Sequence, residues 1–133
     1  MSLSVGAPSL LGPEGILFST RRIYNWNFLC SGEVICDVVG GHLVEIETAD
    51  ETNYLAGLLR ESKVEHAWIG LEDFLTEGDF RWASAGAKPT YTNWDVDQPD
   101  DHQQTQDCVQ LINTGVWRDG NCAHANSFIC ETS

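Results

Sequence analysis

The pattern of apolar and polar residues predicts two helices in the first half of the chain. Residues 31–39 form the first, which ends at Gly40-Gly41 because glycine readily adopts the positive φ that stops a helix. The string Thr48-Ala-Asp-Glu51 is a capping box, whose hydroxyl and carboxylate bond to the free amides that begin the second helix. One face of this helix is apolar and should be buried: Leu55, Leu58 and Leu59.

The other apolar stretches predict strands, most of them late in the chain. Residues 42–46 alternate apolar and polar side chains, and residues 67–71 read as a buried strand. Residues 12–18 are expected to form a turn that leads into an edge strand, and further short strands are expected at residues 24–28, 80–82, 90–92, 109–112 and 128–130. The pattern therefore predicts a tail over residues 1–11 and one α+β domain over residues 12–133.

The stretch from Asn93 to Asp107 has neither helical nor strand periodicity and is predicted to be a loop. It carries five carboxylates and no Lys or Arg: Asp95, Asp97, Asp100, Asp101 and Asp107. Such clustered charges repel one another unless a cation or an ordered ligand holds them, and calcium favours clusters of oxygen ligands. Composition alone leaves both a cation-binding loop and a solvated polar loop open.

The charge of the chain argues against several classes of function. Seven basic and twenty acidic side chains give a net charge of −13, which disfavours nucleic acid and anionic membrane surfaces as partners. No apolar run has the length of a transmembrane helix. An enzyme is not expected, because the sequence has no nucleophile paired with a base, no HExxH string and no phosphate-binding glycine loop. His66 and His124 are isolated, so a zinc site is not expected either.

Five cysteines in a chain of 133 residues indicate an oxidising compartment, and hence a secreted protein. Residues 1–11 lack the basic start and apolar centre of a secretion signal. Four cysteines can pair, and the fifth would form an intermolecular bridge or stay a free thiol.

Several short strings together resemble C-type lectin-like domains in their order and spacing. They are Gly40-Gly-His-Leu43, Trp68-Ile-Gly-Leu71, Asn93-Trp94, Gln98-Pro-Asp100, Asp107-Cys108, Trp117-Arg-Asp119 and Phe128-Ile-Cys-Glu131. The likeness covers roughly residues 12–133. It implies two helices, antiparallel sheets, a long loop that binds calcium and sugar, and core positions for Trp68, Trp82, Trp94 and Trp117.

The resemblance also implies how the cysteines are used. Cys36 would pair with Cys130, and Cys108 with Cys122. The family's frequent N-terminal pair is missing, which leaves Cys30 without an internal partner. Cys30 would then link two chains in a disulfide-bonded homodimer or remain a buried thiol, and both interpretations stay open.

In calcium-dependent members of this family, the ligands of one calcium ion also bind two neighbouring sugar hydroxyls. The string Gln98-Pro99-Asp100 resembles the version associated with galactose-type sugars, and its proline is expected in the cis form. His102 would pack on the apolar face of a galactose ring or face solvent.

Two positions depart from the family pattern of this site. Asp119 is present, but Gln106 stands where a glutamate is usual, and Arg118 stands where an asparagine is usual. A guanidinium has no lone pair to offer a metal. Either Arg118 turns away, and a weak calcium remains on Gln98, Asp100 and Asp119, or Arg118 takes the position of the calcium and binds hydroxyls itself.

A second ligand set matches the auxiliary calcium of the family's mannose-binding branch: Asp73, Glu77, Asp101 and Asp107. A calcium there would neutralise clustered charge and hold the long loop on the domain. The alternative is that Asp73 and Glu77 only shape a turn.

These observations predict that the chain is a secreted, carbohydrate-binding lectin with a preference for galactose or GalNAc. A defence or agglutinating lectin of innate immunity would be an example. A dimer would strengthen weak single sites by avidity. The competing interpretation is a lectin-like domain that has lost sugar binding and binds a protein, ice or a mineral surface, because fold alone does not fix function.

Overall fold

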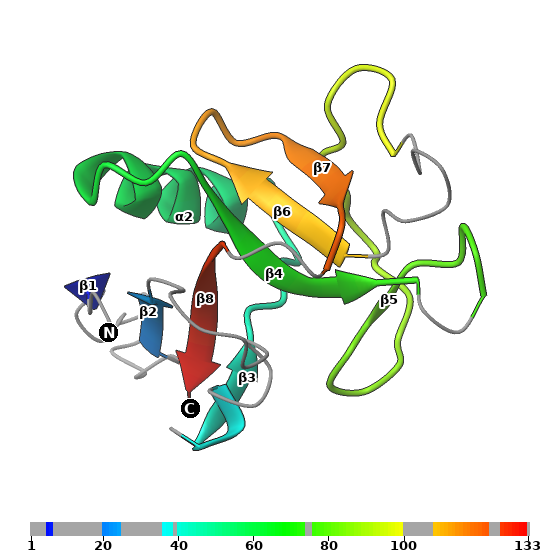
Figure 1. Cartoon of the computed structure of the whole chain (residues 1–133), viewed down its shortest axis with the longest axis horizontal. Coiled ribbons are helices and arrows are strands. Elements are labelled where there is room, and N and C mark those ends of the chain that lie inside the picture. Colours follow the sequence, from blue (N-terminus) through cyan, green and yellow to red (C-terminus); the bar gives the residue numbers. More distant parts are fainter. Residues whose placement is uncertain are drawn as a thin grey trace.

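The computed structural model describes residues 5–6, 20–24, 36–38, 40–73, 76–99, 108–122 and 126–132 (Figure 1). Their strands form one sheet: β1 (Val5–Gly6), β2 (Thr20–Tyr24), β3 (Gly41–Leu43), β4 (His66–Glu72), β5 (Arg81–Trp82), β6 (Cys108–Ile112), β7 (Trp117–Gly120) and β8 (Ser127–Thr132). The order is β1-β2-β8-β4-β6-β7, with β3 on β8 and β5 on β4. Among the described pairs, β4 and β8 run parallel and the others antiparallel. The predicted α+β class is confirmed.

The long helix α2 (Ala49–Glu61) begins at the predicted capping box. The amide of Glu51 donates to Oγ1 of Thr48 over 3.1 Å, and the Glu51 carboxylate accepts from the amide of Glu47 over 3.2 Å. The predicted apolar face is buried against the sheet, since Leu55, Leu58 and Leu59 all belong to the core. Ser62 is the C-cap of the helix, and Lys63 follows with a φ of 58°.

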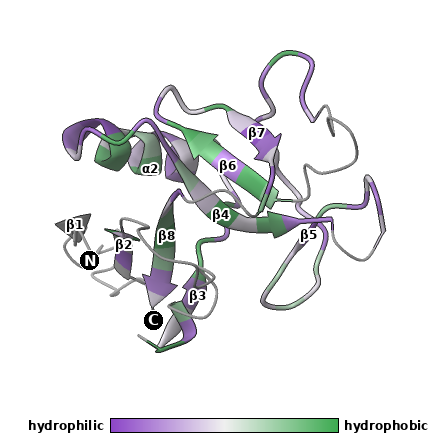
Figure 2. Cartoon of the chain, in the orientation of Figure 1, coloured by the Kyte–Doolittle hydropathy of each residue, from purple (hydrophilic) through white to green (hydrophobic). Residues whose placement is uncertain are grey.

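The core lies between α2 and the middle of the sheet. Figure 2 shows the hydrophobic colour on β6 and along much of β4. Trp82 and Trp117 are buried in this core, Trp94 packs against its edge, and Trp68 packs against a smaller cluster around the disulfide of β8. All four tryptophans therefore take the core or near-core positions that the resemblance implied.

The segment before α2 differs in part from its prediction. Residues 36–38 are helical, as expected, and Gly40 has the predicted positive φ of 87°. The strand predicted at residues 42–46 is wrong in length, because β3 ends at Leu43. Val44 donates its amide to Ile129 and accepts from the amide of Gly70, so it bridges two strands instead of continuing along one.

The later strands were predicted with one error and one omission. β4, β5, β6 and β8 lie where they were expected. Residues 90–92 form no strand, because the aromatic side chain there serves packing: Tyr91 meets Trp117 edge-on at 5.7 Å. Sequence reasoning did not predict β7.

The structure describes two short strands among the first 28 residues. Val5–Gly6, in the predicted tail, pairs with β2. The strand predicted at residues 12–18 lies outside the described residues, as does most of that at 24–28, although Tyr24 ends β2.

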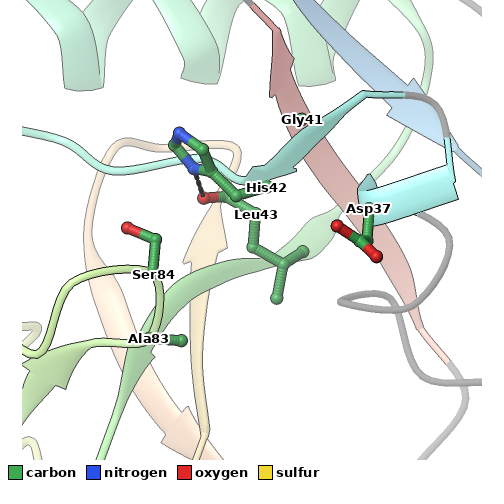
Figure 3. A pocket seen from close by; sticks show the side chains of 6 residues that line it. All are labelled: Asp37, Gly41, His42, Leu43, Ala83 and Ser84. Carbon is green, nitrogen blue, oxygen red and sulfur yellow. Dashed lines mark hydrogen bonds between the residues drawn. The ribbon is translucent and has the colours of Figure 1, made fainter.

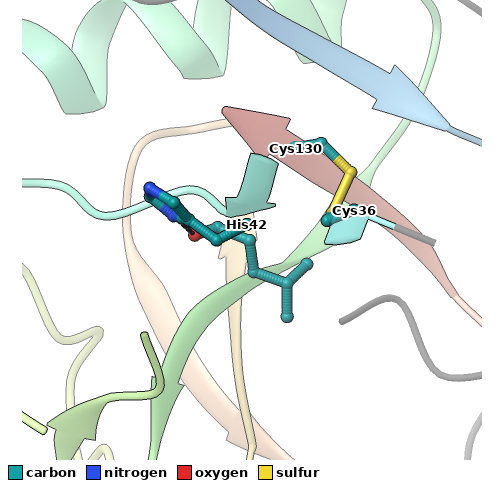
Figure 4. The surroundings of a disulfide bond; sticks show 4 residues. Cys36, His42 and Cys130 are labelled. Carbon is teal, nitrogen blue, oxygen red and sulfur yellow. Dashed lines mark hydrogen bonds between the residues drawn. A yellow bond between two sulfur atoms is a disulfide. The ribbon is translucent and has the colours of Figure 1, made fainter. Parts of the chain in front are cut away.

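Two disulfides confirm the pairing that the resemblance implied. Cys36–Cys130 joins the helical residues 36–38 to β8 (Figure 4), and Cys108–Cys122 joins the start of β6 to the residues after β7. Cys30 lies outside the described residues.

Candidate functional site

The described part of the acidic loop, residues 93–99, is bonded to β7. The amide of Trp117 donates to the carbonyl of Asn93 over 2.9 Å, and the amide of Asp95 donates to the carbonyl of Trp117 over 2.9 Å. The side-chain amide of Asn93 donates to the carbonyl of Gly115 over 2.6 Å. In Figure 1 this segment (yellow) runs beside β7 (orange). The loop is therefore attached to the sheet at its base.

Aromatic packing also holds the base of the acidic loop. The ring of Trp94 lies 5.9 Å from that of Trp117, which is fully buried, and 5.0 Å from that of Phe80. Large rings in such tilted contacts bury much apolar surface. The Asn93-Trp94 string therefore anchors the loop in the core.

A tight turn follows from Asp95 to Gln98. The amide of Gln98 donates to the carbonyl of Asp95 over 3.0 Å, and Oδ1 of Asp95 accepts from the amide of Val96 over 2.8 Å. Asp97 has a φ of 62°, a conformation that aspartate tolerates better than most residues. Val96 stands at the tip of this turn with 83% of its surface exposed.

Gln98 meets β7 through its side chain. Its Oε1 accepts a hydrogen bond from the amide of Asp119 over 3.2 Å, and the Gln98–Pro99 bond is cis, as expected. Asp119 is buried, with 5% exposed. The structure thus brings Gln98 and Asp119 together, whereas Asp100, His102 and Gln106 lie outside the described residues.

Arg118 forms an ion pair with Asp95. Its Nε and Nη2 lie 2.8 and 2.7 Å from Oδ2 of Asp95. The pair is partly exposed, with 49% of the Arg118 side chain and 26% of that of Asp95 accessible. Hydrogen bonding from Arg118, followed by that from the amide of Val96, lowers the pKa of Asp95, so this carboxylate is charged at neutral pH.

Sequence reasoning counted Asp95 among the acids of the loop but not among the site residues. The sequence offered one indication of a partner for Asp95. Residues 93–107 contain no Lys or Arg, so the nearest cation expected at the site is Arg118 of the Trp-Arg-Asp string. Only the folded chain shows that Arg118 reaches Asp95 rather than Asp97, the other acid in the described part of the loop.

The described residues of the primary site do not fit a calcium ion as they stand. Arg118 brings a positive charge and has no lone pair to offer a metal, although Gln98 keeps one lone pair on Oε1 beside its hydrogen bond from Asp119. Calcium instead requires several converging oxygen atoms.

The described half of the auxiliary set does fit a cation. Asp73 is 3% exposed, and its Oδ2 accepts from the amide of Gly78 over 2.9 Å. Its Oδ1 is buried and has no hydrogen-bond partner within the described chain. Glu77 lies on the same turn, between these two residues, and is exposed. Asp101 and Asp107 lie outside the described residues, and the described residues alone contain no group of three His, Cys, Asp or Glu side chains placed to hold a metal ion.

Asp73 also shapes the turn that the alternative interpretation required. Its bond to Gly78 links the two ends of this turn. A buried carboxylate oxygen without a donor is nevertheless costly in free energy unless a cation or a water meets it.

A separate pocket of about 320 Å³ lies between β3 and the turn after β5 (Figure 3). Its lining contains no predicted sugar-site residue: Asp37, Gly41, His42, Leu43, Ala83 and Ser84. His42 and Ser84 stand apart from Asp37, with Leu43 between them, and Nδ1 of His42 donates to the carbonyl of Leu43 over 2.8 Å. His42 is thus a packed side chain bonded to the backbone.

No helix in the described ranges is long and apolar enough to cross a membrane.

Comparison with known proteins places this fold and loop in a known family. The model of the Lectin C-type domain matches residues 29–132. Collectin-11 of Danio rerio is 29% identical over 99 residues, which cover 74% of this chain and 36% of the relative. The chain spans about a third of the length of the curated relatives it matches.

Solved structures agree with this match. The human scavenger receptor C-type lectin carbohydrate-recognition domain is 32% identical, with a TM-score of 0.74 over 85% of this chain and 91% of that domain. The C-type lectin CEL-I from Cucumaria echinata is 29% identical, with a TM-score of 0.72 over 84% of this chain and 89% of that protein. These relatives are binding proteins and not enzymes, in agreement with the absence of catalytic motifs. The chain belongs to the C-type lectin domain family.

Proposed function

We propose that this domain binds carbohydrates of the galactose type where the 93–107 loop meets β7. The observation that carries the proposal is the hydrogen bond from Asp119 to Gln98, because it unites the Gln-Pro-Asp and Trp-Arg-Asp strings. Similar solved structures include domains described as carbohydrate-recognition domains. Gln98-Pro99-Asp100 is the string associated with galactose or GalNAc.

The chemistry of these side chains suits two neighbouring hydroxyl groups. A glutamine amide offers both a donor and an acceptor, a carboxylate such as Asp100 accepts hydroxyl protons, and a guanidinium only donates. The ion pair with Asp95 uses Nε and Nη2 of Arg118, so Nη1 is left to meet a sugar oxygen. His102 would cover the apolar face of the ring, and Gln106 would add a second amide.

The cation of the primary site is then Arg118 and not calcium. This choice follows from the poor fit of a guanidinium, which is positively charged and has no lone pair, to a metal ion. Gln98, Asp100 and Asp119 would act as hydrogen-bonding groups for the sugar and the loop.

Calcium belongs to the auxiliary site in this proposal. The buried Oδ1 of Asp73 supports it, and Glu77, Asp101 and Asp107 would complete the ligand set. A bound calcium would neutralise these carboxylates and fasten the far side of the loop to the turn after β4.

The protein is proposed to be secreted, since two disulfides persist only in oxidising surroundings. Cys30 would link two chains and so present two weak sugar sites at once.

Retention on galactose and mannose resins, with and without a calcium chelator, tests the function. We expect retention on galactose that survives chelation, though weakened, because Arg118 supplies the cation at the sugar. Complete loss on chelation would restore calcium to the sugar site or make the auxiliary ion essential. Absence of retention on both resins would contradict the proposal and favour a domain that binds protein, ice or mineral.

A further inference from the structure

We infer that Asp95 is a positioning residue of the sugar site: its carboxylate holds the Arg118 guanidinium beside the Gln98 turn, and this ion pair joins the loop to β7. The inference rests on the proposed function, since it names a further residue of the same site.

The bonds of Asp95 leave it little freedom to move. Its amide donates to Trp117, its carbonyl accepts from Gln98, and its Oδ1 accepts from the amide of Val96 over 2.8 Å. Its Oδ2 meets both Nε and Nη2 of Arg118. Backbone and side chain are thus bonded on both sides, so the carboxylate offers Arg118 a fixed partner.

The position of Asp95 links the pair to the sugar-binding side chain. Asp95 is the first residue of the turn that Gln98 closes, and Gln98 in turn accepts from Asp119, the neighbour of Arg118 on β7. Within the described residues 93–99, the side chains of Asp95 and Gln98 therefore attach the loop to successive residues of β7. If one of these attachments is lost, the guanidinium and the amide are no longer held at a defined separation.

Charge gives Asp95 a role that no other described acid shares. Within the described ranges, the other ion pairs engage Arg21, Arg81 and Lys88 with acids elsewhere. Asp97 lies on the same turn as Asp95 but forms no ion pair in the described chain. Arg118 is accordingly held by Asp95 in particular.

The partial exposure of the Asp95–Arg118 ion pair distinguishes a role in positioning Arg118 from a role in stabilising the fold. An ion pair that is open to solvent contributes little to the free energy of folding. Removing the charge of Asp95 should therefore change sugar affinity while leaving thermal unfolding almost unchanged.

The test is a double-mutant cycle with a matched control. Asp95→Asn keeps an oxygen for the amide of Val96 but removes the charge that holds Arg118. Asp97→Asn makes the same chemical change two residues away. The affinity of each variant for a galactose-bearing glycan is measured at fixed calcium by surface plasmon resonance, together with its thermal unfolding.

We expect Asp95→Asn to weaken the affinity roughly fivefold with an unchanged unfolding temperature, and Asp97→Asn to bind like the wild type. In an Arg118→Gln background, Asp95→Asn should have no further effect, because the two residues act as one unit. If Arg118→Gln binds too weakly to measure, Asp95→Asn is compared instead with Asp95→Glu, which keeps the charge that pairs with Arg118 and should bind more tightly than Asp95→Asn.

Equal affinity of the wild type and Asp95→Asn, or fully additive effects in the cycle, would overturn the inference while leaving the proposed function intact. A wild type that binds neither galactose nor mannose would overturn both. The two failures are therefore distinguishable.

Discussion

Arg118 and Asp119 are neighbours on β7 but have opposite surroundings: the side chain of Arg118 is 49% exposed, whereas Asp119 is only 5% exposed. Successive residues of a strand face opposite sides of the sheet, which explains this division. Arg118 reaches Asp95 at the surface, while the backbone of Asp119 holds Gln98. Changes at Arg118 should consequently affect the site without disturbing the core.

Arg118→Ala is expected to abolish retention on galactose, because it removes the cation from the sugar site. The unfolding temperature should still rise with calcium, since the auxiliary ligands are intact. Arg81→Ala is the matched control, because Arg81 is a partly exposed arginine that pairs with Asp79 and not with an acid of the loop. Unchanged galactose affinity in Arg118→Ala would show that the guanidinium is not part of the site.

Asp73→Asn should remove the stabilisation by calcium. If the auxiliary site exists, calcium at a hundred times its Kd would stabilise the wild type by about 2.7 kcal/mol, and loss of a buried ligand should reduce this increment strongly. The asparagine oxygen can still accept from Gly78, so the turn is retained. Differential scanning calorimetry with calcium and with chelator measures the increment. Asp79→Asn is the control, and an equal increment in Asp73→Asn would contradict the auxiliary site.

The contribution of Asp95 should be lost only in acid. Because Arg118 lowers the pKa of Asp95 in the folded chain, the ion pair is complete above the ordinary aspartate value of about 3.9 and is lost as the pH falls through the lowered pKa. The affinity ratio of the wild type to Asp95→Asn should thus stay constant from about pH 7 to pH 5 and approach one in stronger acid. A ratio that already changes between these two values would contradict the assignment.

Thr48→Ala should lower the free energy of unfolding by about 1 kcal/mol, because Thr48 caps the first free amides of α2. Urea unfolding followed by circular dichroism measures the change. Thr114→Ala, at an exposed turn position, should have almost no effect. Equal values for the two variants would show that the capping box contributes nothing measurable.

Cys30→Ser should convert a disulfide-linked dimer into a monomer. A non-reducing gel compares it with the wild type, and a reduced sample of each gives the monomer position. Migration of the unreduced wild type as a monomer would end the dimer hypothesis and favour a buried thiol.

Local patterns predicted the parts of the fold that local physics determines. The capping box at Thr48 and the apolar face of Leu55, Leu58 and Leu59 are encoded within a few residues, and both were confirmed. β7 was missed because Trp117-Arg-Asp-Gly is short and carries two charges, so its strand character comes from pairing with β6. The strand predicted around Tyr91 was wrong for the opposite reason, because the Tyr91 ring packs on Trp117 while its backbone pairs with no strand.

The site was predictable only where a known family supplied the pattern. Gln98, Arg118 and Asp119 were identified by resemblance, and the structure brings them to one place. Asp95 was not identified, because its bond to Arg118 spans 23 positions of the chain and depends on how the loop lies against β7. No local pattern distinguishes it from the other acids of the loop.

The position of β8 within the sheet has a consequence for biosynthesis. This strand pairs with β2, β3 and β4, and Cys130 within it bonds to Cys36 across 94 positions. A nascent chain that has not yet released Ser127–Thr132 from the ribosome has no strand to place between β2 and β4. The sheet of this domain can therefore close only after translation of β8, and until then the edges of β2 and β4 are open to pairing with other chains.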